Sequence, residues 1–398
     1  MLGADRGVVG SGVRLDPDRS VRPGDGEDGR GQVAATNLFG EHLEGAIESV
    51  GIEAPRRRRQ VAARHVPMMP QRRELRRSRI MSAMPDWIWL DGDLVDAHAP
   101  HLRVSDRGFQ LGDGIFETGR ARRGIVIELD EHLERLREGA AALSLNLPVG
   151  DEALVEAIAD LLVAEGLAGA GGEGGVPGDA ALRITVSRGP FEQRGLLPPG
   201  SADVPATIAI QAWPYVPPPA ELLARGVRAV RSSVRRDPAS PLAGIKSTSR
   251  ADYVYAKLEA ARAGADDALF LTIDGAISEG TSANVFVIAG RALGTPPRAA
   301  AILPGTTRTW LLAHAEALGF DAAEVELRPE QLLAADEAFL SSSIAGIVPL
   351  TAFDGRPIGG GRPGPRTLAL RQAREAWIDA MSLAALLADP EDAEDPIP

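Results

Sequence analysis

The spacing of hydrophobic and polar residues becomes regular only from Trp87 onward. Short runs in which every second residue is apolar then alternate with longer runs of helical spacing, as in a chain of strands and amphipathic helices. The dipeptide Asp91-Gly92 separates two apolar runs and predicts a tight hairpin turn. The strands predicted from such runs are Ile88–Leu90, Leu94–Val95, Ile115–Arg120, Ile125–Glu128, Leu182–Ser187, Thr207–Ala212, Val227–Val234, Ala268–Thr272, Asn284–Ile288, Ala323–Leu327 and Glu337–Ser341.

Helices are predicted where apolar residues recur three or four positions apart. In Leu129–Leu143, the side chains of Leu133, Leu136 and Ala140 share one face, and Asp130 is expected to be the N-cap. The other predicted helices are Leu154–Ala164, Ser249–Ala263, Thr306–Leu318, Pro329–Ala334 and Arg366–Ala384. Helices and strands interspersed in this way predict an α/β protein of the mixed α+β class.

The segment W-P-Y-V-P-P-P (Trp213–Pro219) is rich in proline, which makes it a stiff spacer, and we expect it to link two domains. The predicted division is a smaller N-terminal domain at residues 85–213 and a larger C-terminal domain at residues 214–387. Residues 388–398 are acidic and contain proline, and they are expected to form a loose tail.

Residues 1–84 differ in composition from the rest of the chain. Residues 1–80 hold 15 Arg against 11 Asp and Glu, whereas residues 81–398 hold 28 basic against 44 acidic side chains. This Arg/Gly-rich segment is interpreted as a disordered leader, or as an extension upstream of a true start at Met81 or Met84. Contact of its basic runs with an acidic partner stays open as an alternative.

Composition excludes several classes of function. The chain has no cysteine, which rules out disulfides, thiolate metal sites and cysteine nucleophiles, and its six histidines are too scattered to predict a zinc centre. A net charge of −12 provides no general field for nucleic acid. Neither a secretory signal nor an apolar run of about 18 residues is seen, so we expect a cytoplasmic protein that does not enter the membrane.

Only two lysines, Lys246 and Lys257, occur among the 43 basic residues. Arginine cannot form a Schiff base, because its guanidinium group stays protonated. A lysine in so lysine-poor a chain is therefore a candidate for chemistry, and chance retention is the simpler alternative. Lys257 lies in the middle of a predicted helix among charged neighbours, and we expect it to be solvated.

Seven sequence blocks between residues 86 and 385 resemble the class IV pyridoxal-phosphate-dependent aminotransferases. They are S-D-R-G-F-Q-L-G-D-G-I-F-E-T-G-R (Ser105–Arg120), L-D-E-H-L-E-R-L (Leu129–Leu136), L-R-I-T-V-S-R-G (Leu182–Gly189), G-I-K-S (Gly244–Ser247), I-S-E-G-T-S-A-N-V-F (Ile277–Phe286), L-P-G-T-T-R (Leu303–Arg308) and F-L-S-S-S-I-A-G-I-V-P (Phe339–Pro349). This family includes branched-chain and D-amino-acid aminotransferases and aminodeoxychorismate lyases. The resemblance implies fold type IV, with two α/β domains, the cofactor in the cleft between them, and a homodimer.

The resemblance also implies that Lys246 carries pyridoxal 5'-phosphate as a Schiff base. A neutral amine is required for this bond, and burial beside a cationic group provides it by lowering the lysine pKa. Glu279 is implied to face the pyridine nitrogen. A carboxylate there keeps the nitrogen protonated, so that the ring can absorb the electrons released when the substrate Cα–H bond breaks. The simpler alternative for Glu279 is a carboxylate in a turn between two strands.

The phosphate of the cofactor requires positive charge and hydrogen-bond donors. Arg135 matches the family's phosphate-binding arginine, and its alternative role is an ion pair with Glu131 one helical turn away. Thr306 and Thr307 follow a Pro-Gly turn at a predicted helix start, where free amides favour an anion, although a plain N-cap would look the same. Ser343 is implied to add a hydroxyl group.

The substrate-binding residues implied by the resemblance are Phe116, Ile344 and Arg194, the last as the site for a substrate carboxylate. Arg107, Arg188 or backbone amides are the alternatives for that carboxylate. The tyrosine that branched-chain aminotransferases carry five residues after the lysine is replaced by Ala251. D-amino-acid aminotransferases carry a tyrosine where Phe116 stands and a histidine where Leu196 stands.

Two residues favour different branches of the family. Arg250 is reminiscent of the lyases, whereas Glu117 suits the aminotransferases. We therefore predict an aminotransferase that moves an amino group from an amino acid to a 2-oxo acid. A lyase that eliminates pyruvate from aminodeoxychorismate is the alternative.

Overall fold

The computed structural model describes residues 85–168, 179–193, 195–197, 199–200 and 203–387, which all belong to one compact unit of the chain. Its strands form two sheets, one of six strands and one of nine. The first sheet uses strands up to Pro214, which includes the first two residues of the predicted linker, and the second sheet begins at Val227, after the linker. The division into domains at these boundaries stays a prediction, and the leader and tail lie outside the described residues.

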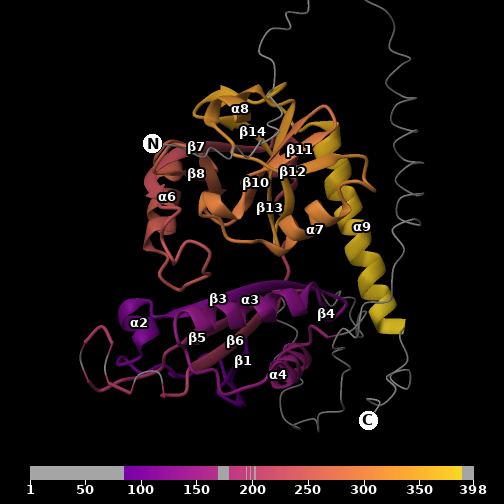
Figure 1. Ribbon diagram of the computed structural model, residues 1–398. Coiled ribbons are helices and arrows are strands. Elements are labelled where there is room, and N and C mark those ends of the chain that lie inside the picture. The colour runs from indigo at the N-terminus through magenta and orange to yellow at the C-terminus, as the bar shows by residue number, and fades with distance from the viewer. Residues whose placement is uncertain (1–84, 169–178, 194, 198, 201–202, 388–398) are drawn as a thin grey trace, which may run out of the picture. The chain divides into compact units, whose positions relative to one another are not determined.

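The first sheet is antiparallel throughout, in the order β2-β1-β6-β5-β3-β4. Helices α3 and α4 lie against it in Figure 1 and pack on β3, β1 and β6. The described elements of this part are β1 (Trp87–Leu90), β2 (Asp93–Asp96), α2 (Arg107–Leu111), β3 (Gly114–Arg122), β4 (Ile125–Val126), α3 (Leu129–Ala142), α4 (Asp151–Ala164), β5 (Ala180–Ser187) and β6 (Thr207–Pro214).

The two faces of the first sheet differ in chemistry because successive side chains of a strand point to opposite faces. On one face, Leu182, Ile184 and Val186 of β5 are buried in a single cluster with leucines of α3 and α4. On the other face, Arg183 and Thr185 are only half-buried. Phe116 pairs with Thr185 across the strands and therefore shares this second face.

The second sheet is mixed; eight of its strands follow the order β12-β11-β10-β13-β14-β7-β8-β9, and the ninth, β15, pairs with β14. A further pairing of β10 with β9 closes six of its strands into a ring, at the pair Asn284 and Glu279. Helix α6 packs on β7 and β8, α7 on β13, and α9 on β13 and β14.

The elements of this second part are α5 (Ala220–Arg225), β7 (Val227–Arg236), α6 (Ala251–Arg262), β8 (Asp267–Thr272), β9 (Ile277–Gly280), β10 (Asn284–Ala289), β11 (Ala292–Thr295), a 3-10 turn (Arg298–Ala300), α7 (Thr306–His314), β12 (Asp321–Glu324), α8 (Pro329–Ala334), β13 (Glu337–Ser342), β14 (Gly346–Phe353), β15 (Arg356–Pro357) and α9 (Pro365–Leu387).

The predicted hairpin and the six predicted helices are confirmed, with shifted ends. One local prediction is wrong. Helix α3 is preceded by Glu128, not capped by Asp130, because the Glu128 carboxylate is held by Arg374 of α9 at 2.8 Å and its backbone adopts φ 55°. The alternative of a turn position for Glu279 does not hold, because Glu279 lies within strand β9 and pairs with Asn284 of β10.

Candidate active site

Lys246 lies in the loop between β7 and α6, and this loop is fastened to strand β3. The backbone N–H of Phe116 donates to the carbonyl of Lys246 at 2.9 Å, and the N–H of Thr248 donates to Gly114 at 2.9 Å. Ile115 and Ser247 form an isolated bridge between the same two segments. These bonds fix the backbone of the lysine against the first sheet, although the lysine belongs to the second half of the chain.

The amine of Lys246 lies 4.9 Å from the centre of the Phe116 ring. It forms no hydrogen bond or ion pair with the part of the chain that the structure describes. Burial lowers the pKa of this amine to about 8; Glu117 opposes the change, and Arg135 and Arg250 add to it. A larger fraction of the amine is therefore neutral near pH 7 than in an ordinary lysine. Lys257 differs, because its exposed amine donates to the carbonyl of Asp266 at 2.6 Å.

Glu279 is a buried carboxylate with partners on both oxygens. Its Oε2 accepts the backbone N–H of Leu303 at 2.9 Å, and its Oε1 accepts the hydroxyl of Tyr253 at 3.1 Å. A guanidinium nitrogen of Arg236 lies 3.7 Å from Oε1. Burial raises the pKa of Glu279, and these partners act against that rise.

Tyr253 and Arg236 are neighbours of Glu279 that the sequence did not reveal. Tyr253 stands seven residues after Lys246, and not five as in branched-chain aminotransferases, so a search at the family position finds only Ala251. It belongs to α6, whereas Glu279 belongs to β9, and only the fold brings the two side chains together. No sequence pattern marks Arg236 as a neighbour of Glu279.

Arg135 is held by Glu117, which replaces the alternative of an ion pair with Glu131. Its Nε and one terminal nitrogen each donate to the Glu117 carboxylate at 2.7 Å, and His132 contacts the same carboxylate at 2.8 Å. Burial alone would raise the pKa of Glu117, but the hydrogen bonds from Arg135 and His132 lower it to about 2. The carboxylate is therefore ionised throughout the neutral range.

The guanidinium of Arg135 also reaches the second half of the chain. One of its nitrogens donates to the carbonyl of Pro304 at 2.5 Å, directly before the start of α7. Three of its five N–H groups are used by Glu117 and Pro304, so two remain for an anion. Arg135 is thus brought to the helix start that the sequence analysis selected as a phosphate site.

Helix α7 begins at Thr306 with no side chain capping it, so its first amide groups are open to an anion. Thr306 and Thr307 are both buried, and the Thr306 hydroxyl lies 3.2 Å from that of Ser343. The turn before the helix is tight: a Cβ on Gly305 would come within 2.2 Å of the Asn284 side chain. The structure therefore brings Arg135, Thr306 and Ser343 to one place.

Three cationic groups surround Phe116 on the half-buried face of the first sheet. Arg183 lies 3.9 Å from the ring centre, Arg250 lies 5.7 Å away, and the amine of Lys246 lies 4.9 Å away. Neither arginine forms an ion pair with a described residue; Arg183 donates to the hydroxyl of Thr185 at 3.0 Å, and Arg250 to the carbonyl of Thr281 at 3.3 Å. Burial lowers the pKa of Arg183, and the like charge of Arg250 lowers it further.

The other candidate residues for substrate are placed less favourably or lie outside the description. Arg194 lies outside the described residues, so its role stays a prediction. Arg107 and Arg188 are both buried and share the carboxylate of Asp113, each with an Nε contact of 2.8 Å. Those ion pairs leave neither arginine free for a substrate carboxylate. Ile344 is half-buried in the turn after β13, next to Ser343.

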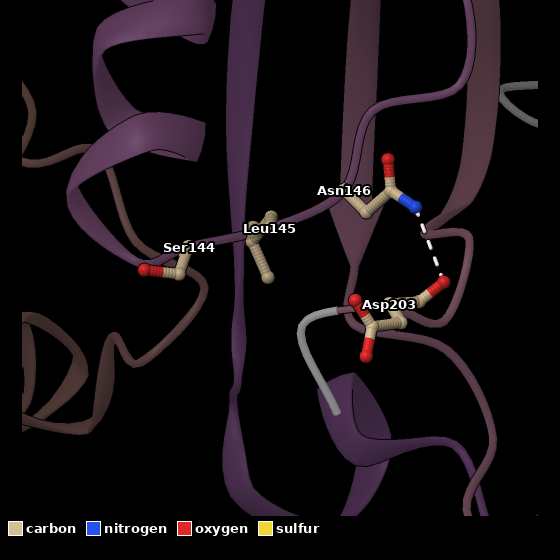
Figure 2. Close-up of a pocket in the computed structure, with 4 residues that line it drawn as sticks. All are labelled: Ser144, Leu145, Asn146 and Asp203. Carbon is tan, nitrogen blue, oxygen red and sulfur yellow. Dashed lines mark hydrogen bonds between the residues drawn. The ribbon is translucent and has the colours of Figure 1, made fainter. Parts of the chain in front are cut away.

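A small surface pocket lies elsewhere and shares none of these residues. It is lined by Ser144, Leu145, Asn146 and Asp203, and the amide of Asn146 donates to the carbonyl of Asp203 at 3.2 Å (Figure 2). Among the described side chains no group of three His, Cys, Asp or Glu residues could hold a metal ion. None of the helices that the structure describes is long and apolar enough to cross a membrane.

Comparison with known proteins defines the class to which this fold and site belong. Residues 114–353 match the model of the family described as Amino-transferase class IV. A Methanocaldococcus jannaschii protein provisionally named branched-chain-amino-acid aminotransferase is 34% identical over 286 residues, which cover 72% of this chain and 94% of that protein. The D-alanine aminotransferase of Bacillus licheniformis is 30% identical over 73% of this chain and 96% of that enzyme.

A solved structure agrees with this result. The T.th. branched-chain amino acid aminotransferase complexed with N-(5'-phosphopyridoxyl)-L-glutamate has a TM-score of 0.67 and 27% identity, and the match covers 78% of this chain and 97% of that one. The chain belongs to the class IV aminotransferase family and has the type IV fold of pyridoxal-phosphate enzymes. It is a pyridoxal-phosphate-dependent aminotransferase that transfers an amino group from an amino acid to a 2-oxo acid, as the names of the relatives above indicate. A solved structure of a Legionella pneumophila protein provisionally named 4-amino-4-deoxychorismate lyase also matches, with a TM-score of 0.60 and 27% identity over 69% of this chain and 96% of that one.

The described residues fit this cofactor. An aldehyde, a ring nitrogen and a phosphate require an amine, a carboxylate and an anion site, and the described residues include a lysine amine without a partner, a buried carboxylate and an uncapped helix start beside an arginine. Each of the three groups comes from a different segment, and the hydrogen bonds described above hold these segments together.

Proposed function

We propose that Lys246 binds the cofactor covalently and that Glu279 receives its ring nitrogen. In the same proposal, Arg135, Thr306, Thr307 and Ser343 hold its phosphate. The observation that carries this assignment is the amine of Lys246, whose pKa is lowered to about 8 by burial and which has no partner among the described residues. When bound, the cofactor supplies an electron sink for the substrate carbon.

The residues of this chain then have separable tasks. Glu279 holds a proton on the ring nitrogen, because an ionised carboxylate stabilises the protonated ring. The Nζ atom of Lys246 takes the proton from the substrate Cα and returns it, since it is the only described amine at the site. Phe116 covers one side of this position and helps to exclude water.

The substrate carboxylates are proposed to bind Arg183 and Arg250. Two half-buried guanidinium groups that repel each other and lack an acidic partner are stabilised when an anion binds between or beside them. Two cations at different distances from Phe116 suit a substrate with two carboxylates. The glutamate adduct in the T.th. enzyme is consistent with this class of substrate. Phe116 and Ile344 would provide the apolar contacts, and Arg194 stays a further candidate.

The assignment of Lys246 is tested by borohydride reduction of the enzyme loaded with pyridoxal phosphate, followed by peptide mapping. We expect a single adduct, on Lys246, and we expect none in Lys246→Ala. The matched control is Lys257→Ala, which should label as the wild-type protein does, because Lys257 is exposed and paired with Asp267. An adduct on Lys257, or no adduct at all, would show that the assignment is wrong.

The carboxylate site is tested by steady-state kinetics of Arg183→Leu and Arg250→Leu with glutamate and with leucine as amino donors. A charged hydrogen bond contributes about 1.5–3 kcal/mol, so KM for glutamate should rise roughly 10–100-fold in each variant. Leucine has only the α-carboxylate, so KM for leucine should rise in the variant that loses the α-carboxylate site and should change less than about threefold in the other variant. Arg194→Ala serves as the comparison, and a larger glutamate-specific effect in that variant would transfer the role to Arg194.

We further propose a homodimer, a cytoplasmic location, and two domains at residues 85–213 and 214–387. The dimer is supported by large apolar side chains that are exposed on α2 and in the nearby loop, including Phe109 at 72% and Leu196 at 83%. Exposed apolar groups gathered in one region are typical of protein contacts. Light scattering of the purified protein tests the dimer directly.

A further inference from the structure

A buried carboxylate does not stay ionised without help. Glu279 is only 4% exposed, and burial raises its pKa towards the range in which the group becomes protonated. A protonated Glu279 would no longer hold a proton on the cofactor's ring nitrogen. The proposed function therefore requires groups that stabilise the Glu279 anion inside the protein.

The contacts to Oε1 of Glu279 come from two elements. Tyr253 of α6 donates its hydroxyl to this oxygen at 3.1 Å, and Arg236, the last residue of β7, places a guanidinium nitrogen at 3.7 Å. The backbone N–H of Leu303 binds the other oxygen, Oε2. Each oxygen of the carboxylate can still accept one more hydrogen bond, because each has two acceptor positions and one donor among the described residues.

Tyr253 and Arg236 are themselves held in place. The Tyr253 ring is buried and packs edge-on against Phe270, with centres 5.0 Å apart, and the guanidinium of Arg250 covers the ring at 3.1 Å. Arg236 donates to Asp252 at 3.1 Å and lies 5.0 Å from the Tyr253 ring centre. Its Nε is buried and has no hydrogen-bond partner among the described residues.

We propose that Tyr253 and Arg236 are positioning residues that keep Glu279 ionised and thereby keep the proton on the cofactor's ring nitrogen. Tyr253 does so by its hydrogen bond and Arg236 by its charge. The hydroxyl of Tyr253 is the donor and not the acceptor, since burial and the neighbouring Glu279 both raise its pKa. This inference rests on the proposed role of Glu279.

The other charged groups that act on Glu279 do not replace these two. Arg250 also lowers the Glu279 pKa, but it forms no ion pair with the carboxylate, and its charge faces the Tyr253 ring and the proposed substrate site. Lys246 interacts electrostatically with Glu279, but its Nζ atom is bonded to the cofactor and then takes and returns a proton, so its charge changes during the reaction. Arg236 is therefore the cation that stays beside Glu279 throughout the reaction.

The experiment uses the loaded enzyme with cofactor labelled with ¹⁵N in the ring, whose chemical shift reports whether this nitrogen carries a proton. A hydrogen bond to a charged group contributes about 1.5–3 kcal/mol, so Tyr253→Phe should move the proton ratio between ring and carboxylate roughly 10–100-fold towards the carboxylate. The ¹⁵N signal of Tyr253→Phe, or of Tyr253→Phe combined with Arg236→Gln, should then shift towards that of neutral pyridine. Turnover should fall with it.

The chain offers close controls. Tyr255 lies two residues further along α6 and is 45% exposed, and Arg235 is exposed on β7 next to Arg236. Tyr255→Phe and Arg235→Gln should leave the ¹⁵N signal unchanged. Circular dichroism of each variant checks that the fold is retained. Compared with Arg236→Gln, Arg236→Lys should give a ¹⁵N signal closer to that of the wild type, because lysine keeps the positive charge.

A double-mutant cycle separates this role from a purely structural one. In a Glu279→Gln background there is no carboxylate to stabilise, so adding Tyr253→Phe should lower turnover less than about threefold. An equal loss with and without Glu279 would overturn the inference, as would an unmoved ¹⁵N signal in the variant that lacks both residues. If Glu279→Gln itself leaves the ¹⁵N signal unmoved, the proposed role of Glu279 is wrong, and the two failures are thus distinguishable.

Discussion

Replacing Glu117 by Gln removes a charge from the first sheet with little change of shape. Glu117 is almost fully buried and binds Arg135 through two bonds of 2.7 Å. Its pKa of about 2 lies roughly 2.5 units below the ordinary value of 4.5. Since one unit corresponds to about 1.4 kcal/mol, the ionised group contributes on the order of 3 kcal/mol to folding at neutral pH. Glu117→Gln should lose about that amount, because it leaves the charge of Arg135 buried and unpaired.

The dependence on pH gives the prediction a sign. A carboxylate whose pKa is lowered by folding stabilises the protein above its unfolded pKa, and this contribution is lost as pH falls through the folded value. The difference between wild type and variant should therefore be constant from about pH 5 to 7 and should shrink between about pH 4.5 and 2. Urea denaturation of the cofactor-free protein, at one protein concentration and at several pH values, measures this difference.

A control and a second readout sharpen the test. Glu134 is exposed and lies next to Arg135 on α3. Glu134→Gln removes this charge and should change the free energy of unfolding by less than about 0.5 kcal/mol. Affinity for pyridoxal phosphate should fall in Glu117→Gln and not in Glu134→Gln, since only Glu117 orients Arg135. A loss below about 1 kcal/mol that does not vary with pH would refute the reasoning.

Three further predictions follow from the site and from the sequence. The rate at which pyridoxal phosphate attaches to Lys246 should rise about tenfold per pH unit up to about pH 8 and then level off, because the amine is nucleophilic only when neutral. Stopped-flow absorbance measures this rate, and a rise that continues to about pH 10 would mean an ordinary lysine. Glu279→Gln should retain bound cofactor and lose turnover equivalent to roughly 2–4 kcal/mol in barrier, and near-normal kcat would make the residue structural. Deleting residues 1–80 should leave cofactor binding and turnover unchanged, because every matched block begins after Met84; an insoluble or inactive truncation would contradict this.

Much of the fold could be predicted because its strands and helices have clear hydrophobic periods. Lys246 and Glu279 could be selected as candidates because each lies in a short contiguous motif that resembles the family. Glu128 could not be recognised as the residue before α3, because its backbone conformation accompanies a contact with Arg374 on a distant helix. Strand β9 was not predicted, since its sequence I-S-E-G holds one apolar residue and therefore shows no alternation of apolar and polar positions.

The contacts that tune the site were out of reach of the sequence. Tyr253 meets Glu279 across 26 residues, and nothing in either local sequence specifies the other. Arg183 left a weak signal in the sequence, because it is a charged residue between Leu182 and Ile184, whose buried side chains point to the opposite face of the strand. A charged side chain in an otherwise apolar strand indicates an exposed or functional face, and the proposed carboxylate site follows the second interpretation.

Strand β3 serves two different purposes with adjacent residues. Glu117 points to the helix-covered face and holds Arg135, whereas Phe116 points to the opposite face beside Lys246 and Arg183. Side chains on the two faces can be exchanged independently, but an insertion or deletion of one residue in this strand would send each to the wrong side. The eight cross-strand pairs from Gly114 with Ser187 to Ala121 with Ala180 resist such a slip. In this chain, a substitution of Phe116 is therefore expected to change the surface beside Lys246 and to leave Arg135 in place, whereas a change in the length of β3 is expected to displace both.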